Sequence, residues 1–82
     1  MTAWVTVRYF AMLRELAGTS EERCEFPFGE TAAGLYRRIA ARYGFALKPE
    51  ELRFAVNDRF VAADRELSLG DVLVFVPPVA GG

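Results

Sequence analysis

The stretch TAAGLYRRIAARYG, residues 31–44, contains the one convincing helix of this chain. Thr31 is a suitable N-cap and Gly44 stands where a left-handed C-cap is expected, so the sequence predicts a helix over residues 32–43. The apolar side chains of this helix recur on one stripe, which predicts a core-facing side. They are Ala32, Leu35, Ile39 and Tyr43. The arginines on the rest of the helix predict a solvated face, although such a cluster is also a candidate anion or partner site.

The segments before this helix have the pattern of strands. Residues 3–10 alternate between two sets of side chains, which is typical of a half-buried strand. Residues 22–28 predict a second strand, and Pro27 near its end indicates the edge of a sheet. Residues 11–16 between them predict a turn of helix or a compact loop that stops at Gly18. We expect the two strands to pair as a hairpin.

The segments after the helix also predict strands. Residues 52–56 and the pair Phe60-Val61 flank Asn57-Asp58, which is strong turn chemistry. The polar connection that follows contains Leu67 and Leu69, and we expect both to anchor it to the core. Residues 72–76 are apolar at every position, which is typical of a central strand or of a strand whose second face is covered by a partner.

The order of elements is strand, strand, helix, short strand pair, strand, which predicts an α+β fold with a mixed four- to five-stranded sheet. One helix can cover only one face of such a sheet. If Leu73 and Phe75 pack under the helix, Val74 and Val76 face the other way, because successive strand residues alternate. With Phe10 and Phe60 they would form an exposed apolar patch, although single exposed apolar residues are ordinary on any protein.

Composition excludes several functions. The chain has 82 residues, enough for one small domain, and its 10 basic and 11 acidic residues leave no charge excess for nucleic acid. It has no histidine and one cysteine, Cys24, so we expect no metal site and no Cys/His catalytic pair. No segment resembles a signal peptide or a transmembrane helix, so we expect a cytoplasmic protein without a membrane partner.

The final residues, Pro77-Pro78-Val79-Ala80-Gly81-Gly82, have the features of a chemical handle on a stiff stalk. Gly81 and Gly82 have no Cβ, so an enzyme can close around their backbone, and each proline favours an extended chain. An ordinary frayed terminus is the alternative. We therefore expect a folded domain over residues 1–76 and a flexible tail over residues 77–82.

Three segments, residues 10–18, 55–57 and 75–82, resemble the small, sulfur-carrying subunit of molybdopterin synthase, the MoaD type, which has the ubiquitin-like β-grasp fold. The most specific part is the Pro-Pro-x-x-Gly-Gly ending after an apolar strand. Val76 departs from the pattern, because an aromatic residue is common at that position in the family. Gly-Gly endings also occur in the thiamine-pathway sulfur carrier and in ubiquitin-like protein modifiers.

The resemblance implies a sulfur carrier that is not an enzyme by itself and binds no cofactor. An ATP-dependent activating enzyme would adenylate Gly82, and a sulfur donor protein would convert it to a thiocarboxylate. The large catalytic subunit, in a heterotetramer, would use that sulfur on cyclic pyranopterin monophosphate. Gly81 would give steric access, and Pro77, Pro78, Val79 and Ala80 would form the stalk. The implied docking residues are Phe10, Arg14, Phe60, Val74 and Val76.

Overall fold

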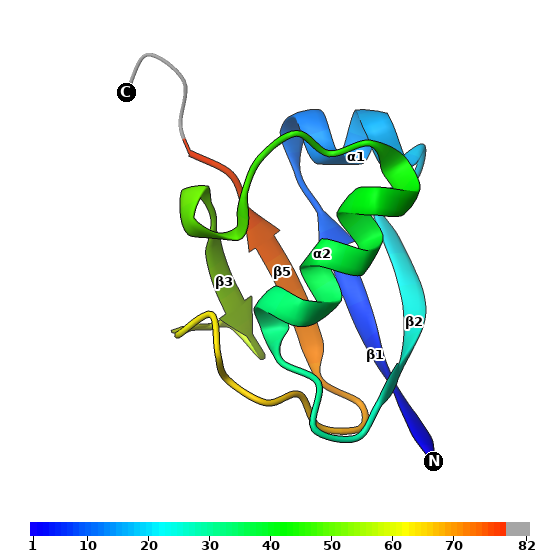
Figure 1. The fold of residues 1–82 in the computed structure, drawn as a ribbon. Coiled ribbons are helices and arrows are strands. Elements are labelled where there is room, and N and C mark those ends of the chain that lie inside the picture. Colours follow the sequence, from blue (N-terminus) through cyan, green and yellow to red (C-terminus); the bar gives the residue numbers. More distant parts are fainter. Residues whose placement is uncertain (79–82) are drawn as a thin grey trace.

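The computed structural model describes residues 1–78. Five strands form one sheet in the order β2-β1-β5-β3-β4, and α2 crosses one face of it (Figure 1). The elements are β1 (Thr2–Tyr9), α1 (Ala11–Ala17), β2 (Glu21–Pro27), α2 (Ala32–Tyr43), the 3-10 helix η1 (Pro49–Glu51), β3 (Arg53–Val56), β4 (Arg59–Val61) and β5 (Val72–Val76). The predicted mixed sheet with one main helix is therefore confirmed.

The strand pairing places β5 in the centre of the sheet. β5 runs parallel to β1 on one side and antiparallel to β3 on the other. β2 pairs antiparallel with β1 at one edge, as predicted, and α1 connects them where a turn of helix or a compact loop was predicted. The β3–β4 pair forms the other edge, and Asn57 and Asp58 turn between its strands with φ of 52° and 70°. Left-handed values at both positions match the right-handed twist of a hairpin.

The predicted helix is confirmed at both ends. The Thr31 side chain accepts a hydrogen bond from the Gly34 N–H at 3.0 Å, and Gly44 is left-handed with φ of 76°. The four predicted stripe residues face the sheet, with Tyr43 half-buried. Tyr36 lies on the same side, fully buried, although the stripe omitted it. Its hydroxyl donates to the Leu47 carbonyl at 2.7 Å, so a polar tip is accommodated in the core.

The core fills the space between α2 and one face of the sheet. Leu73 and Phe75 are fully buried there, as predicted, and the Phe75 ring meets Tyr36 edge-to-face with centroids 4.9 Å apart. Cys24 is also buried in this core. The expectation for the 64–70 connection is half wrong: Leu67 is buried, but Leu69 is 63% exposed. Within residues 1–78, no helix is long and apolar enough to cross a membrane.

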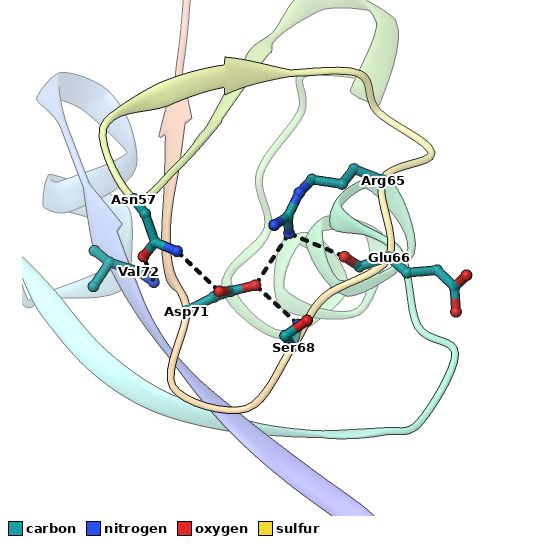
Figure 2. Close-up of polar contacts among 6 residues, drawn as sticks. All are labelled: Asn57, Arg65, Glu66, Ser68, Asp71 and Val72. Atoms are coloured by element: carbon teal, nitrogen blue, oxygen red, sulfur yellow. Dashed lines mark hydrogen bonds and ion pairs between the residues drawn. The ribbon is translucent and has the colours of Figure 1, made fainter.

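A buried carboxylate, Asp71, lies at the end of the sheet where β5 begins (Figure 2). Its oxygens accept hydrogen bonds from the Asn57 amide at 3.0 Å, the Arg65 guanidinium at 3.1 Å and the Ser68 N–H at 2.9 Å. Asn57 in turn accepts from the Val72 N–H at 3.0 Å. This network ties the β3–β4 turn and the long connection to β5, which sets the register of the central strand.

Candidate docking face and tail

The face of the sheet opposite α2 carries an apolar area around β5. α1 and η1 lie at the end of the sheet toward which β5 runs, not on this face (Figure 1). Val72, Val74 and Val76 alternate with the buried residues of β5 and are only half-buried. Ala55 of β3 lies directly opposite Val74 on one side. On its other side Ala55 lies opposite Phe60, which is 59% exposed.

We call these five residues the apolar face: Ala55, Phe60, Val72, Val74 and Val76. Cross-strand neighbours on one face of a sheet lie close enough to make one continuous surface. Three members, Phe60, Val74 and Val76, were predicted from the sequence as docking residues, and the register brings them together. Ala55 was not predicted, and the only signal for it was its alternation with Phe54 and Val56 along a short strand.

The β1–β2 half of the same face is polar. Arg8 and Glu21, which are directly opposite each other, form an exposed ion pair at 3.1 Å. The Arg23 guanidinium stacks on the Trp4 ring, with 4.0 Å to its centroid. This half is therefore solvated, and the apolar face lies nearer to β3 and β4.

The remaining predicted docking residues lie at the end of the sheet that the tail leaves. Tyr9 lies beside Phe75 in the parallel β1–β5 pair, so Phe10 follows β1 at the same end at which Val76 precedes Pro77. Phe10 is half-exposed as the N-cap of α1, and Arg14 is exposed on that helix. Phe10 and Arg14 thus border this end of the sheet.

Four of the six predicted tail residues lie outside the part of the chain that the structure describes. Pro77 is half-buried and Pro78 is exposed, and neither has regular secondary structure. The predicted Val79, Ala80, Gly81 and Gly82 lie outside the described residues. The structure therefore describes only the base of the tail, Pro77 and Pro78.

Sequence reasoning missed Arg53, which lies directly opposite Val76 at this base. Its guanidinium stacks on the Phe60 ring, with 3.8 Å to the centroid. The two residues are diagonal neighbours across β3 and β4, a separation that a long side chain spans. Alternation within β3 would have placed the Arg53 side chain on the other face of the sheet from Phe54. Only the register between strands reveals which residues of β5 and β4 lie next to Arg53.

The titratable groups within the core have structural roles. The Tyr9 and Tyr43 hydroxyls both donate to Glu22 Oε2 at 2.6 Å, and the Arg42 guanidinium lies 3.8 Å from Glu22 Oε1. Burial, and then the hydrogen bond to Glu22, raises the pKa of Tyr9 far above its ordinary value. Burial also raises the pKa of the Cys24 thiol, which makes it a poor nucleophile. Among residues 1–78 no cluster of three metal-ligating side chains occurs.

Comparisons with known proteins identify the family of this chain. A family model described as the ThiS family matches residues 7–82. The chain belongs to the ThiS family. This ThiS-family chain is 40% identical over 83 residues to the molybdopterin synthase sulfur carrier subunit of Escherichia coli (strain K12), covering 95% of the chain and 99% of the relative. The resemblance stated from the sequence is therefore confirmed.

Solved structures confirm the fold of this ThiS-family chain. A Pyrococcus furiosus protein provisionally named molybdopterin converting factor, subunit 1, superposes with a TM-score of 0.78 at 36% identity, covering 94% of this chain and 99% of that one. Caldiarchaeum subterraneum ubiquitin, at 16% identity, shares the fold with a TM-score of 0.68 over 100% of both chains. The fold is the ubiquitin-like β-grasp.

A third solved structure of this group is a complex. It is the protein–protein complex of subunits 1 and 2 of the molybdopterin-converting factor from Helicobacter pylori 26695. The matched chain has a TM-score of 0.61 at 25% identity, covering 96% of this chain and 99% of that one. A relative of this chain thus assembles with a second protein.

Proposed function

We propose that this chain is the sulfur-carrier subunit of a molybdopterin synthase and that Gly82 carries the sulfur. The observation that supports this most directly is the register of the sheet. It places Phe60, Val74 and Val76 on one apolar face whose last residue immediately precedes Pro77. A partner that covers this face would receive the following residues into its own interior. The 40% identical relative is named for this role.

The chemistry of the tail requires activation. A terminal carboxylate has a pKa of roughly 3.3 to 3.7 and is ionised and unreactive near neutral pH. In the proposed cycle the activating enzyme joins the Gly82 carboxylate to the α-phosphate of ATP and releases pyrophosphate. A sulfide equivalent from the donor protein then attacks the acyl carbon, AMP leaves, and a thiocarboxylate remains. Gly81 lets the activating enzyme and the large subunit approach the backbone closely.

Sulfur transfer takes place on the large subunit in this proposal. The thiocarboxylate sulfur attacks a side-chain carbon of cyclic pyranopterin monophosphate, and a carbon–oxygen bond at that carbon breaks, its oxygen leaving as water or staying on the opened phosphate. Water then cleaves the acyl–sulfur bond, which leaves the sulfur on the pterin and restores the Gly82 carboxylate. Two carriers are used for each dithiolene. Groups that bind and polarise the pterin are assigned to the large subunit. This division is supported by the lack of histidine in the chain and by the raised pKa values of Cys24 and Tyr9. Phe10 and Arg14 border the entry of the tail into the partner.

The proposal is tested by changing the end of the chain without touching the fold. One alanine added after Gly82 should abolish molybdopterin formation in a reconstituted synthase and leave the unfolding curve unchanged. The same alanine added before Met1 is the matched control and should retain activity. Full activity of the C-terminally extended protein would overturn the proposal.

Intact-mass analysis of native protein supplies the second measurement. The proposal expects a species heavier by the difference between one sulfur and one oxygen, together with capture of the large subunit. A thiocarboxylate that accompanies the thiazole-forming enzyme would instead identify a thiamine-type carrier. An isopeptide bond from Gly82 to lysines of other proteins would identify a protein modifier.

A further inference from the structure

A cation stacked on an aromatic ring lies at the base of the tail. The Arg53 guanidinium lies 3.8 Å from the centroid of Phe60, and both side chains are exposed. Stacking occupies one flat face of the guanidinium and leaves its N–H edge available, because those donors lie in the plane of the group. The stack therefore orients a set of donors on the open face.

The surroundings of Arg53 are apolar. Its direct cross-strand neighbour is Val76, and its neighbour on the same side of β3 is Ala55, which lies opposite Val74 and Phe60. A partner that packs on these residues would remove water from the guanidinium as well. A charge that loses water without a compensating partner is costly, so this position demands an anion on whatever covers it.

The charge of Arg53 has no carboxylate partner within the described part of the chain. Ion pairs form there at Arg8, Arg38, Arg42 and Arg65, and none forms at Arg53. Other exposed arginines also lack an ion pair among residues 1–78, namely Arg14, Arg23, Arg37 and Arg59. Of these unpaired arginines, Arg53 is the one that lies directly opposite Val76 at the base of the tail. An unmatched positive charge among apolar residues at this position favours an acidic group on the partner.

A second stack on the same face provides an internal comparison. Arg23 lies 4.0 Å above the Trp4 ring and, like Arg53, is a diagonal cross-strand neighbour of its aromatic partner. Arg23 shares its side of β2 with Glu21 and Glu25, so acids surround its charge. The two stacks have the same local geometry, but only one of them is set among apolar residues beside the tail.

We propose that Arg53, held on Phe60, binds a carboxylate on the partner protein that covers the apolar face. The inference rests on the proposed function, with the large subunit of the synthase as that partner. The planar fork of arginine fits a carboxylate with two parallel hydrogen bonds. A surface without an acid at this point would leave the guanidinium buried and unpaired, so Arg53 would select among partners as well as strengthen the correct one.

The test is the affinity of the full chain for the large subunit of molybdopterin synthase from the same organism, measured by calorimetry at low and high salt. Arg53→Gln should weaken binding by about 10- to 100-fold and should flatten the salt dependence of the affinity. Arg53→Lys should fall between wild type and Arg53→Gln, because it keeps the charge but loses the fork. Arg23→Gln is the matched control and should bind within about twofold of wild type.

A charge reversal adds a positive test. Arg53→Glu should bind still more weakly than Arg53→Gln, and replacing one acid of the large subunit by arginine should restore binding to Arg53→Glu alone. Arg53 and Arg23 are both exposed, so each variant should fold like the wild type, and unfolding curves check this.

The outcomes separate the two proposals. If the wild-type chain does not bind the large subunit, the proposed function fails and this inference fails with it. If the wild type binds but Arg53→Gln behaves like Arg23→Gln, the function stands and the carboxylate anchor is wrong. Tighter binding by Arg53→Gln would also overturn it, because the guanidinium would then oppose the contact instead of anchoring it.

Discussion

The two faces of the sheet differ most clearly along β5. Leu73 and Phe75 on one side are fully buried beneath α2, whereas Val74 and Val76 on the other are only half-buried. All four are apolar, so hydrophobicity alone does not distinguish them. The difference follows from the number of helices available, because a single helix of 12 residues covers only one face.

Polar groups are also treated differently on the two faces. On the α2 side, the Tyr9, Tyr36 and Tyr43 hydroxyls all donate to acceptors of the same chain. On the open side, the Arg23 and Arg53 guanidiniums stack on aromatic rings and keep their donors exposed. The covered face thus pairs its hydroxyl groups within the chain, while the open face leaves its guanidinium donors to solvent or, as proposed, to a partner. Four substitutions, the first with a matched control on the same strand, test this comparison.

The largest expected effect is on the covered face. Phe75→Ala should lower the free energy of unfolding by about 3–5 kcal/mol, because it removes a ring from a core that cannot collapse around the gap. Val74→Ala on the same strand should cost about 1 kcal/mol or less. Urea unfolding of both variants measures the contrast. Equal losses would mean that the two faces do not differ in packing.

A smaller loss is expected at the buried carboxylate that positions β5. Asp71→Asn should destabilise the protein by about 2–3 kcal/mol, because an amide has one acceptor oxygen where the carboxylate uses two. Since Asp71 lies at the end of β5 away from the tail, affinity of the folded variant for the large subunit should stay at the wild-type level. A large loss of affinity would show that this network also shapes the open face.

The stability difference between wild type and Asp71→Asn should depend on pH in a defined way. Burial alone would raise the pKa of Asp71, but hydrogen bonds from Ser68, Arg65 and Asn57 outweigh it and hold the pKa below its ordinary value. A carboxyl group with a lowered folded-state pKa contributes its full stability above its unfolded pKa of about 3.9 and loses it as the pH falls through the folded value. The stability gap between wild type and Asp71→Asn should therefore narrow below about pH 4. A gap that is constant from neutral to acidic pH would contradict this.

The third substitution, Phe60→Ala, tests the open face of the sheet. Phe60→Ala should weaken binding to the large subunit by roughly 30-fold, or about 2 kcal/mol, as expected for an aromatic residue at an interface. Its effect on unfolding should stay within about 0.5 kcal/mol, because the ring is largely exposed. Calorimetry and urea unfolding of the same sample give both numbers. A stability loss without a binding loss would reverse the assignment of this face.

The smallest effect is expected in the polar half of the open face. Arg8→Gln removes an ion pair in which both side chains are about half exposed. Such pairs contribute little, so stability should change by less than about 0.5 kcal/mol and partner affinity by less than about twofold. The measurements are the same as for Phe60→Ala, and a tenfold loss of affinity would extend the docking surface to β1.

Most of the local structure was predictable. The limits of α2, the pairing of β1 with β2 and the turn at Asn57-Asp58 follow from caps, alternation and turn chemistry. Leu69 was misplaced because a connection without periodicity gives no sign of which apolar residue turns inward. Tyr36 was missed because a hydroxyl in the core depends on an acceptor, the Leu47 carbonyl, that the helix pattern does not contain.

The candidate site was predicted only in part, because alternation along a strand can be read from the sequence but the register between strands cannot. Phe60, Val74 and Val76 could be assigned to the open face from the period of two along each strand. Arg53 could not be placed beside them, because its relation to Val76 depends on the register between β3 and β5. The docking roles of Phe10 and Arg14 at the tail end of the sheet stay predictions.

The sequence by itself determined the kinds of element and the two sides of each, because caps, turns and alternation depend on residues a few positions apart. Only the tertiary structure decided that β5 lies between β1 and β3 and that Arg53 meets both Val76 and Phe60. Those neighbours come from distant parts of the chain, and their register is set by the packing of one face against α2 and by the hydrogen bonds of Asp71. The packing of the covered face therefore fixes which residues lie side by side on the open face.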